Sequence, residues 1–184
     1  MNNYIALLRG INVSGHNKIK MTDLKQLFLN LGFQNIKTYI QSGNVLFHSD
    51  EKDISYLEKN IKSAIKKNFD YDIKVLVITK KIIQSAFTSN PFLKNKTPDI
   101  TKLCVTFLSE NPTADGLLQL EEVASKGEDE FKLKDNFLYL HCPTSFAKTK
   151  LTNNLIERKL KVNATSRNWK TITKLFELSQ ENFE

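Results

Sequence analysis

Hydrophobic residues follow two kinds of spacing along the first 80 residues, and each spacing predicts one kind of secondary-structure element. Alternating or short continuous apolar runs are typical of strands, whereas apolar residues spaced three and four apart mark one face of a helix. In chain order the predicted elements are a strand over 4–9, a helix over 23–31, strands over 35–41 and 44–49, a helix over 54–69 and a strand over 73–79. This order is that of a ferredoxin-like unit, or alpha-beta plait.

Local signals set the ends of these elements. Thr22 is the expected N-cap of the first helix. Gly32 is expected to end that helix in the left-handed conformation, with Phe33 packing back on its last turn. Ser42–Gly43 is expected to be the tight connection of a hairpin, in which Gly43 supplies a positive φ.

The order partly repeats after residue 80. A short helix near 80–89 and a loop marked by Asn90–Pro91 and Thr97–Pro98 separate the two halves. The elements predicted next are a strand over 102–109, a helix over 113–125, a hairpin of 130–135 and 137–142, a helix over 149–160 and a second helix over 167–179 where a fourth strand would complete the repeat. The predicted fold class is therefore α+β, with two tandem ferredoxin-like subdomains, the second modified by a C-terminal helix. The expected divisions are residues 1–80, a helix and linker over 81–100, and residues 101–184.

Composition limits the class of protein. The chain has 184 residues, of which 40% are hydrophobic and 26% charged, which indicates a globular protein. No apolar run approaches the roughly 20 residues that a membrane-spanning helix needs, and the first residues lack a secretory pattern. Two cysteines cannot form a disulfide framework, so we expect Cys104 and Cys142 to be free thiols in a cytoplasmic protein without a membrane partner.

The charge balance points to anionic partners. Lys and Arg number 27 against 20 acidic residues, for a net charge of +7. A basic protein is attracted to polyanions, although lysines at helical spacing more often form a solvated helix face. The three arginines, Arg9, Arg158 and Arg167, are more informative than the lysines because a guanidinium matches phosphate and carboxylate geometry.

Catalytic signatures are sparse. His16, His48 and His141 have no metal-ligand spacing, so no metal site and no cofactor is predicted. Cys104 lies in an apolar strand, and the adjacent His141–Cys142 pair would point to opposite faces of its strand. Catalytic residues therefore stay unassigned.

Polar chemistry concentrates in three segments, 9–20, 41–44 and 150–169. A glycine-rich loop between a strand and a helix can present backbone N–H groups to an anion, although turn glycines often only reverse the chain. In the helix expected over 149–160, the polar residues Lys150, Asn154 and Arg158 are spaced four apart and are therefore expected on one face. The candidate ligand-binding residues are Arg9, Asn12, Lys18, Gln41, Ser42, Asn44, Lys150, Asn154, Arg158, Arg167 and Asn168.

At these segments the chain resembles a bacterial family of proteins of unknown function, DUF1697. The pieces that carry the resemblance are ALLRGINVSGHNKIKM, TYIQSGNVLF, KLTNNLIERKL and ATSRNWKTITKL. The resemblance implies a small soluble cytoplasmic protein with two tandem alpha-beta plaits, and it implies no activity. It places the family's polar positions on the candidate residues above and on Gly10, Gly43, Asn153 and Trp169. The chain departs from the family pattern at Phe146–Leu151 and at Ser14.

Three functions remain open at this point. The first is binding of an anionic, phosphate-bearing small molecule or nucleic acid through the Gly/Asn/Arg-rich surface. The second is an enzyme that uses the same polar residues, although the sequence offers no convincing general base. The third is a protein-interaction module, since this fold serves many functions. The oligomeric state is left open.

Overall fold

A computed structural model describes residues 1–13, 15–94 and 99–181. Ser14 and the predicted Thr97–Pro98 loop lie outside the described residues. Contacts divide the chain into two units, and each is described by itself below. The first unit consists of Met1–Gln84 with Leu175–Glu184, and the second of Ser85–Lys174. The boundaries fall inside two helices, α3 (Lys80–Thr88) and α6 (Trp169–Gln180).

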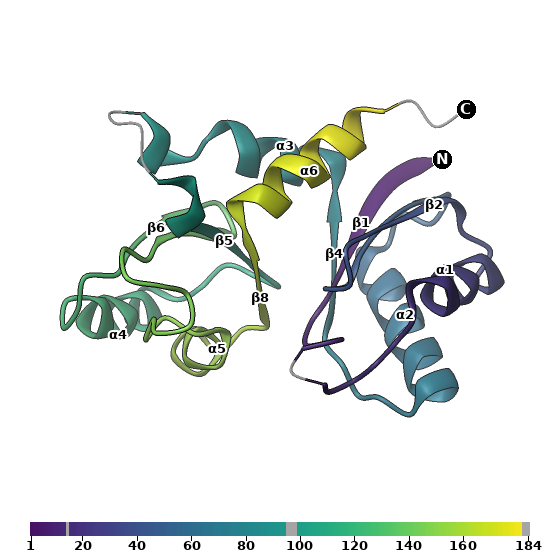
Figure 1. The fold of residues 1–184 in the computed structure, drawn as a ribbon, viewed down its shortest axis with the longest axis horizontal. Helices are drawn as coiled ribbons and strands as arrows, with labels where there is room; N and C mark the ends of the chain where they lie inside the picture. Colours follow the sequence, from purple (N-terminus) through teal and green to yellow (C-terminus); the bar gives the residue numbers. More distant parts are fainter. Residues whose placement is uncertain (14, 95–98, 182–184) are drawn as a thin grey trace. The chain divides into compact units, whose positions relative to one another are not determined.

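The first unit contains a four-stranded antiparallel sheet with two helices on one face (Figure 1). Alternate residues of the strands, such as Tyr4, Ala6 and Phe47, pack on Leu24 and Ile61 of the helices. The strand order is β2-β3-β1-β4, so the first and third strands are central. The elements are β1 (Asn2–Leu8), α1 (Met21–Asn30), β2 (Gln34–Tyr39), β3 (Asn44–Ser49), α2 (Ile54–Phe69) and β4 (Val75–Thr79).

The start of α1 differs from the prediction, and its end agrees with it. The N-cap is Lys20, which makes no side-chain capping bond, and Thr22 lies inside the helix, so its predicted capping role is wrong. Gly32 has a φ of 81°, as predicted for a left-handed helix end. The rings of Phe28 and Phe33 then lie 5.7 Å apart, which confirms the predicted contact with the last turn.

The β2–β3 connection is longer than predicted. It spans Ile40–Gly43, because Tyr39 pairs with Asn44, so Ser42–Gly43 is only its second half. Gly43 has the predicted positive φ, 75°. A Cβ on Gly43 would lie 2.7 Å from Leu8 Cβ and 2.9 Å from Ile11 Cγ1. The missing side chain therefore lets the turn pack against the end of β1.

The second unit repeats this arrangement. Its sheet is also four-stranded and antiparallel, in the order β6-β7-β5-β8, with α4 and α5 on one face (Figure 1). Its elements are two 3₁₀ turns, η1 (Pro91–Leu93) and η2 (Ile100–Lys102), followed by β5 (Leu103–Leu108), α4 (Ala114–Ala124), β6 (Glu130–Lys134), β7 (Phe137–His141), α5 (Asn153–Leu160) and β8 (Ala164–Asn168). The predicted α+β class is thus confirmed as two four-stranded antiparallel sheets, each with helices.

Two predictions for the second unit are wrong. A fourth strand exists, β8, and α6 begins only at Trp169, so no helix over 167–179 replaces that strand. The segment was not recognised because ATSRN has no apolar run: Ser166 and Asn168 occupy one face of the strand. The second correction concerns α5, which begins at Asn153 after its N-cap Thr152. Lys150 therefore precedes the helix and does not share a helical face with Asn154 and Arg158.

None of the helices among the described residues has both the length and the apolar character required to cross a membrane.

Candidate functional site

Two of the predicted segments meet at one end of the first sheet. We call the described residues 9–13 and 15–20, together with residues 40–44, the loop–turn cluster. The Leu8 N–H donates to Gly43 O over 2.8 Å, which joins the end of β1 to the β2–β3 turn. The Arg9 N–H donates to Lys74 O over 2.9 Å, just before β4 begins. The 9–20 loop and the 40–44 turn therefore leave the sheet side by side.

Asn12 holds the two parts of the loop–turn cluster together. Its Nδ2 donates to Ile19 O and to Gln41 O, each over 2.9 Å, and its Oδ1 accepts from the Ile19 N–H over 2.9 Å. Both amide donors of Asn12 are thereby used within the protein. Asn12 thus positions the loop against the turn and has no donor left for a ligand.

Asn44 has a similar role in the turn. Its side chain is fully buried, and its Nδ2 donates to Tyr39 O and to Ser42 Oγ, each over 3.1 Å. These bonds close the four-residue turn and fix the Ser42 hydroxyl. Gln41 is exposed, and Ser42 is half-buried.

The backbone of the loop–turn cluster is strained at non-glycine residues. Asn12, Asn17 and Ile40 have φ values of 54°, 47° and 50°. Asparagine tolerates the left-handed region, whereas a β-branched residue rarely enters it. Ile40 is nevertheless held there with 47% of its surface exposed. Strain of this kind persists where the surrounding structure enforces it, and it concentrates at functional sites.

The charge of the loop is of one sign. Residues 9–20 include Arg9, Lys18 and Lys20 and no acidic residue. Lys18 and Lys20 are exposed, and Arg9 is half-exposed. The loop therefore presents cationic side chains from a backbone that Asn12 holds in place.

The same junction in the second unit has a different loop. The Leu108 N–H donates to Asn136 O and the Ser109 N–H to Asn163 O, each over 2.9 Å. These bonds correspond to those of Leu8 and Arg9 in the first unit. Here only residues 109–113 separate the strand from α4, and their one charged residue is Glu110. In the second unit a short loop without a cation thus connects β5 to α4.

The predicted residues of the second unit do not all lie together. Lys150, Asn154 and Arg158 are exposed. Arg167 is only 8% exposed, and its Nη1 donates to Thr165 Oγ1 and Ser166 O, each over 2.9 Å. Burial lowers the pKa of the Arg167 guanidinium to about 10, so it is still protonated at neutral pH. Asn168 alternates with Arg167 along β8, so their side chains leave opposite faces of the sheet.

A cavity of ≈ 380 Å³ lies on the face of the second sheet that carries Asn168. Its floor comes from the strands and its wall from the segment that leads into α5. We call it the α5 cavity. The lining residues are Cys104, Leu140, Phe146, Thr149, Leu151, Thr152, Asn153, Ser166 and Asn168.

Hydrogen bonds order the polar side of the α5 cavity. The Oγ1 of Thr106 and the Oγ of Ser166 are 2.6 Å apart, and Ser166 Oγ donates to Asn153 Oδ1 over 2.6 Å. Because the single hydroxyl proton of Ser166 goes to Asn153, Thr106 donates to Ser166. Burial raises the pKa of the Cys104 thiol to about 12, so this residue of the floor is uncharged at neutral pH.

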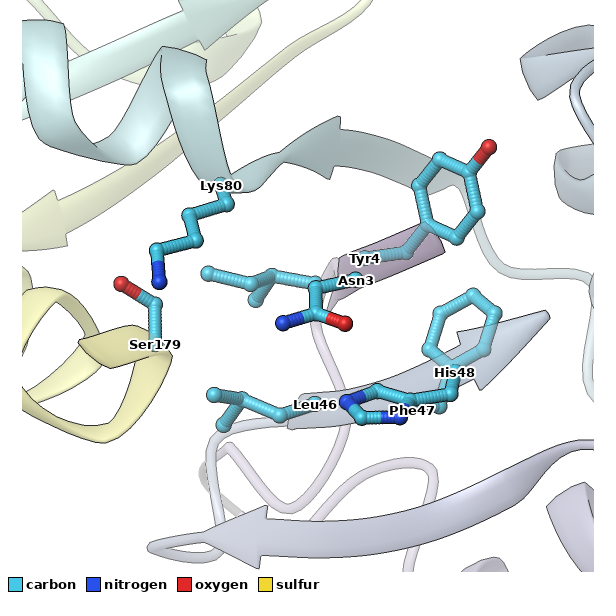
Figure 2. Close-up of a pocket in the computed structure, with 8 residues that line it drawn as sticks. Asn3, Tyr4, Leu46, Phe47, His48, Lys80 and Ser179 are labelled. Carbon is cyan, nitrogen blue, oxygen red and sulfur yellow. The ribbon is translucent and has the colours of Figure 1, made fainter. Parts of the chain in front are cut away.

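A second, smaller pocket lies in the first unit (Figure 2). In Figure 2 the Lys80 and Ser179 side chains point toward one another, and His48 lies farther away, near Leu46. Its volume of ≈ 10 Å³ holds about one water molecule and no organic ligand. Burial, with a smaller contribution from the N-terminal amino group, lowers the pKa of His48.

No group of three or more His, Cys, Asp or Glu residues that could hold a metal ion occurs in the part of the chain that the structure describes. Cys104 and Cys142 are both buried free thiols. Burial raises the pKa of Cys142 to about 11, so neither thiol is an activated nucleophile at neutral pH.

Sequence reasoning missed most of the α5 cavity. Of its lining residues only Asn168 was a candidate, and Asn153 entered only through the family resemblance. Thr152 could have been found, because a threonine before Asn-Asn-Leu-Ile is a helix N-cap signal. Ser166 could not have been found from the sequence, because its place in the cavity depends on the strand β8, which was not predicted.

Comparisons with known proteins address the family and the fold. The model of the family described as "Protein of unknown function (DUF1697)" matches residues 1–139. A solved structure, that of the conserved bacterial protein SP0830 from Streptococcus pneumoniae, superimposes with a TM-score of 0.77 at 22% identity, over 97% of this chain and 99% of that one. This likeness shows a shared fold. No curated protein gave a match.

Proposed function

The chain belongs to the DUF1697 family of proteins of unknown function, and we propose that it binds an anionic, phosphate-bearing ligand at the loop–turn cluster of its first unit. The proposal rests on a difference in length and charge between two equivalent loops, each of which connects the first strand of a unit to its first helix. The second unit closes its junction with residues 109–113, whereas the first uses residues 9–20. The fold does not require the longer loop, and the cations that this loop adds suit an anionic ligand.

The loop–turn cluster also has the rigidity that a binding site needs. Asn12 ties the loop to Gln41 O, and Asn44 ties the turn to Ser42 Oγ. A prearranged site loses less conformational entropy when a ligand binds. The left-handed conformation of Ile40 supports the same interpretation, because such strain concentrates where function requires it.

The side chains suit a phosphate group. Arg9 supplies a planar guanidinium and Lys18 a mobile ammonium, and both interact favourably with phosphate oxygens. The Ser42 hydroxyl and the Gln41 amide can add hydrogen bonds to the same group. We propose the exposed residues Lys150, Asn154 and Arg158 as separate anion contacts within the second unit.

Two broader proposals accompany this function. We propose that each unit is a ferredoxin-like fold, which the strand orders β2-β3-β1-β4 and β6-β7-β5-β8 support. We propose a cytoplasmic location, which the buried free thiols Cys104 and Cys142 support.

The binding proposal is tested with pyrophosphate and with a single-stranded oligothymidylate, by calorimetry and by fluorescence anisotropy. Arg9→Gln and Lys18→Gln should each weaken binding about tenfold, the usual effect of one lost charge-assisted hydrogen bond. Lys59→Gln removes the same charge from an exposed position of α2 and should leave affinity unchanged. Equal affinity in Arg9→Gln, Lys18→Gln and Lys59→Gln would refute the site.

The dependence of affinity on salt identifies the kind of anion. A nucleic acid held by several phosphates loses affinity steeply, with a slope of about −0.7 per phosphate contact for a single strand. Pyrophosphate held by Arg9 and Lys18 should show a much shallower slope. Failure of both probes at low salt would contradict anion binding at this surface.

A further inference from the structure

The α5 cavity has the size of a small-molecule site. Its volume of ≈ 380 Å³ falls in the range of about 300–1,000 Å³ that is typical of ligand pockets. All of its lining residues belong to the second unit. It shares no residue with the loop–turn cluster, so what it binds is independent of the function proposed above.

Three polar side chains of the α5 cavity each accept one hydrogen bond from the protein. Asn153 Oδ1 accepts from Ser166, over 2.6 Å. Thr152 Oγ1 accepts from the Leu155 N–H over 3.2 Å, and Asn168 Oδ1 accepts from the Thr171 N–H over 2.8 Å. The same side chains present donors to a ligand: the Nδ2 of each asparagine and the hydroxyl proton of Thr152.

The rest of the lining carries no charged side chain. None of the described residues that line the cavity is ionised at neutral pH, since Cys104 keeps its proton. An ion entering the cavity would lose hydration without meeting an opposite side-chain charge. Leu140, Leu151 and Phe146 supply apolar surface beside the donors.

We propose that the α5 cavity binds a neutral heterocycle that carries carbonyl or ring-nitrogen acceptors along one edge, the chemistry of the base of a nucleoside. The acceptor edge faces Asn153, Thr152 and Asn168, and the ring lies on the apolar surface. The bonds from Thr106 to Ser166 and from Ser166 to Asn153 hold the Asn153 amide so that its Nδ2 is the donor. Ser166 is therefore a positioning residue for Asn153.

Uridine is the probe that tests this proposal, because its base is an uncharged ring with two carbonyl acceptors, one on each side of a single N–H donor. Binding is followed by the backbone amide signals of the lining residues in heteronuclear NMR spectra. We expect uridine to shift the signals of Leu151, Ser166 and Asn168 in a saturable manner. Benzoate, which is anionic and similar in size to the base, should bind more weakly.

Asn153→Asp is the decisive variant. The carboxylate still accepts from Ser166 and lies in the first turn of α5, where negative charge is favourable, so the unit should stay folded. It replaces the Nδ2 donor by an acceptor, and we expect uridine to bind at least about tenfold more weakly. Asn163→Asp makes the same chemical change at an exposed position outside the cavity and should bind uridine like the parent chain.

Ser166→Ala distinguishes the orientation of the Asn153 amide from its direct contact with uridine. It leaves Asn153 in place but removes the bond that orients its amide, so uridine affinity should fall less than in Asn153→Asp. Unchanged affinity in Asn153→Asp would overturn the proposal. So would tighter binding of benzoate than of uridine, or a lack of saturable shifts up to the solubility limit of uridine.

Discussion

The second helix of each unit, α2 in the first and α5 in the second, is built in the same way although the two differ in length, 16 against 8 residues. Each begins with a side-chain cap on the third residue of the helix: Asp53 accepts from Tyr56 N, and Thr152 from Leu155 N. Each also ends at a non-glycine residue in the left-handed conformation. These ends are Asp70, with a φ of 59°, and Lys161, with a φ of 56°.

A glutamate five residues after the cap completes this likeness. Glu58 Oε1 accepts from the Val77 N–H over 2.8 Å, and Glu157 Oε1 accepts from the Ala164 N–H over 2.9 Å. Val77 and Ala164 lie in β4 and β8, the edge strands of their sheets. In both units a carboxylate of the helix thus satisfies a backbone donor of an edge strand and fixes the helix against it.

The difference between the units is where their remaining polar residues lie. The first unit places them in the 9–20 loop, whereas the second uses a short loop and forms the α5 cavity instead. Contacts that recur in both units are those that the fold requires. Features that occur in one unit only are therefore the better candidates for function. Examples are the hydrogen bonds of Asn12 in the first unit and those that join Thr106, Ser166 and Asn153 in the second.

Gly43→Ala should have the largest effect on stability, because the β2–β3 turn of the first unit packs closely against the end of β1. The new Cβ would lie 2.7 Å from Leu8 Cβ, at a φ of 75° that disfavours any side chain. Overpacking and left-handed strain together should cost about 3 kcal/mol, measured by urea unfolding.

Gly10→Ala is the matched control for this change. Gly10 has nearly the same φ, 72°, but a Cβ there meets nothing within 4 Å. It should cost only the conformational term, about 1 kcal/mol. Equal losses in Gly43→Ala and Gly10→Ala would show that steric contact with Leu8 contributes nothing.

Glu58→Ala and Glu157→Ala test whether the repeated contact stabilises both units. Each removes the acceptor of an edge-strand N–H at Val77 or Ala164, both of which are buried. An unsatisfied buried donor costs about 1–3 kcal/mol, so we expect a loss of that size in each variant. Amide hydrogen exchange should increase mainly in β4 for the first variant and in β8 for the second, and exchange that increases in neither strand would refute the common role.

The fold could be largely predicted from hydrophobic spacing because most strands have an apolar core face. β8 was missed because Ser166 and Asn168, which line the α5 cavity, put polar side chains on that face. The role of Gly116 in α4 also depends on tertiary structure. A Cβ there would lie 2.9 Å from Lys159 O, so the residue lets α4 approach α5 closely, a contact between segments that the sequence alone does not place together.

The sequence predicted which segments form the candidate site better than it predicted what each residue does there. The sequence identified the 9–20 and 41–44 segments, and topology brings them to one end of the sheet. It could not show that Asn12 and Asn44 use their amides inside the protein, because their partners are backbone atoms of distant residues. Nor could it show that Arg167 is buried, since that depends on the register of β8 with β5.

Asp53→Ala and Thr152→Ala sharpen the comparison of the two helices at their first turns. Loss of an N-cap costs about 1 kcal/mol. Asp53 also places a negative charge at the positive end of the helix dipole, so its loss should cost a few tenths of a kcal/mol more than that of Thr152. The measurement is urea unfolding at low and high salt, and the extra loss in Asp53→Ala should shrink as salt screens the charge.

Glu58→Gln should have the smallest effect, and one that depends on pH. Burial raises the pKa of Glu58 above its ordinary 4.5, and the bond from Val77 only partly offsets this. The folded chain therefore binds the Glu58 proton more tightly than the unfolded chain does. This contribution to stability is fully present below pH 4.5 and is lost as the pH rises through the higher pKa of the folded state.

Glutamine keeps an acceptor for the Val77 N–H and does not ionise. The stability of Glu58→Gln relative to the parent chain should therefore increase as the pH rises above 4.5 and then level off, by less than about 1 kcal/mol because the carboxyl is only partly buried. Urea unfolding between acidic and neutral pH measures it. Glu122→Gln, at an exposed position of α4, accounts for the change in net charge. A relative stability that falls with rising pH would show that the bond to Val77 outweighs the burial of Glu58.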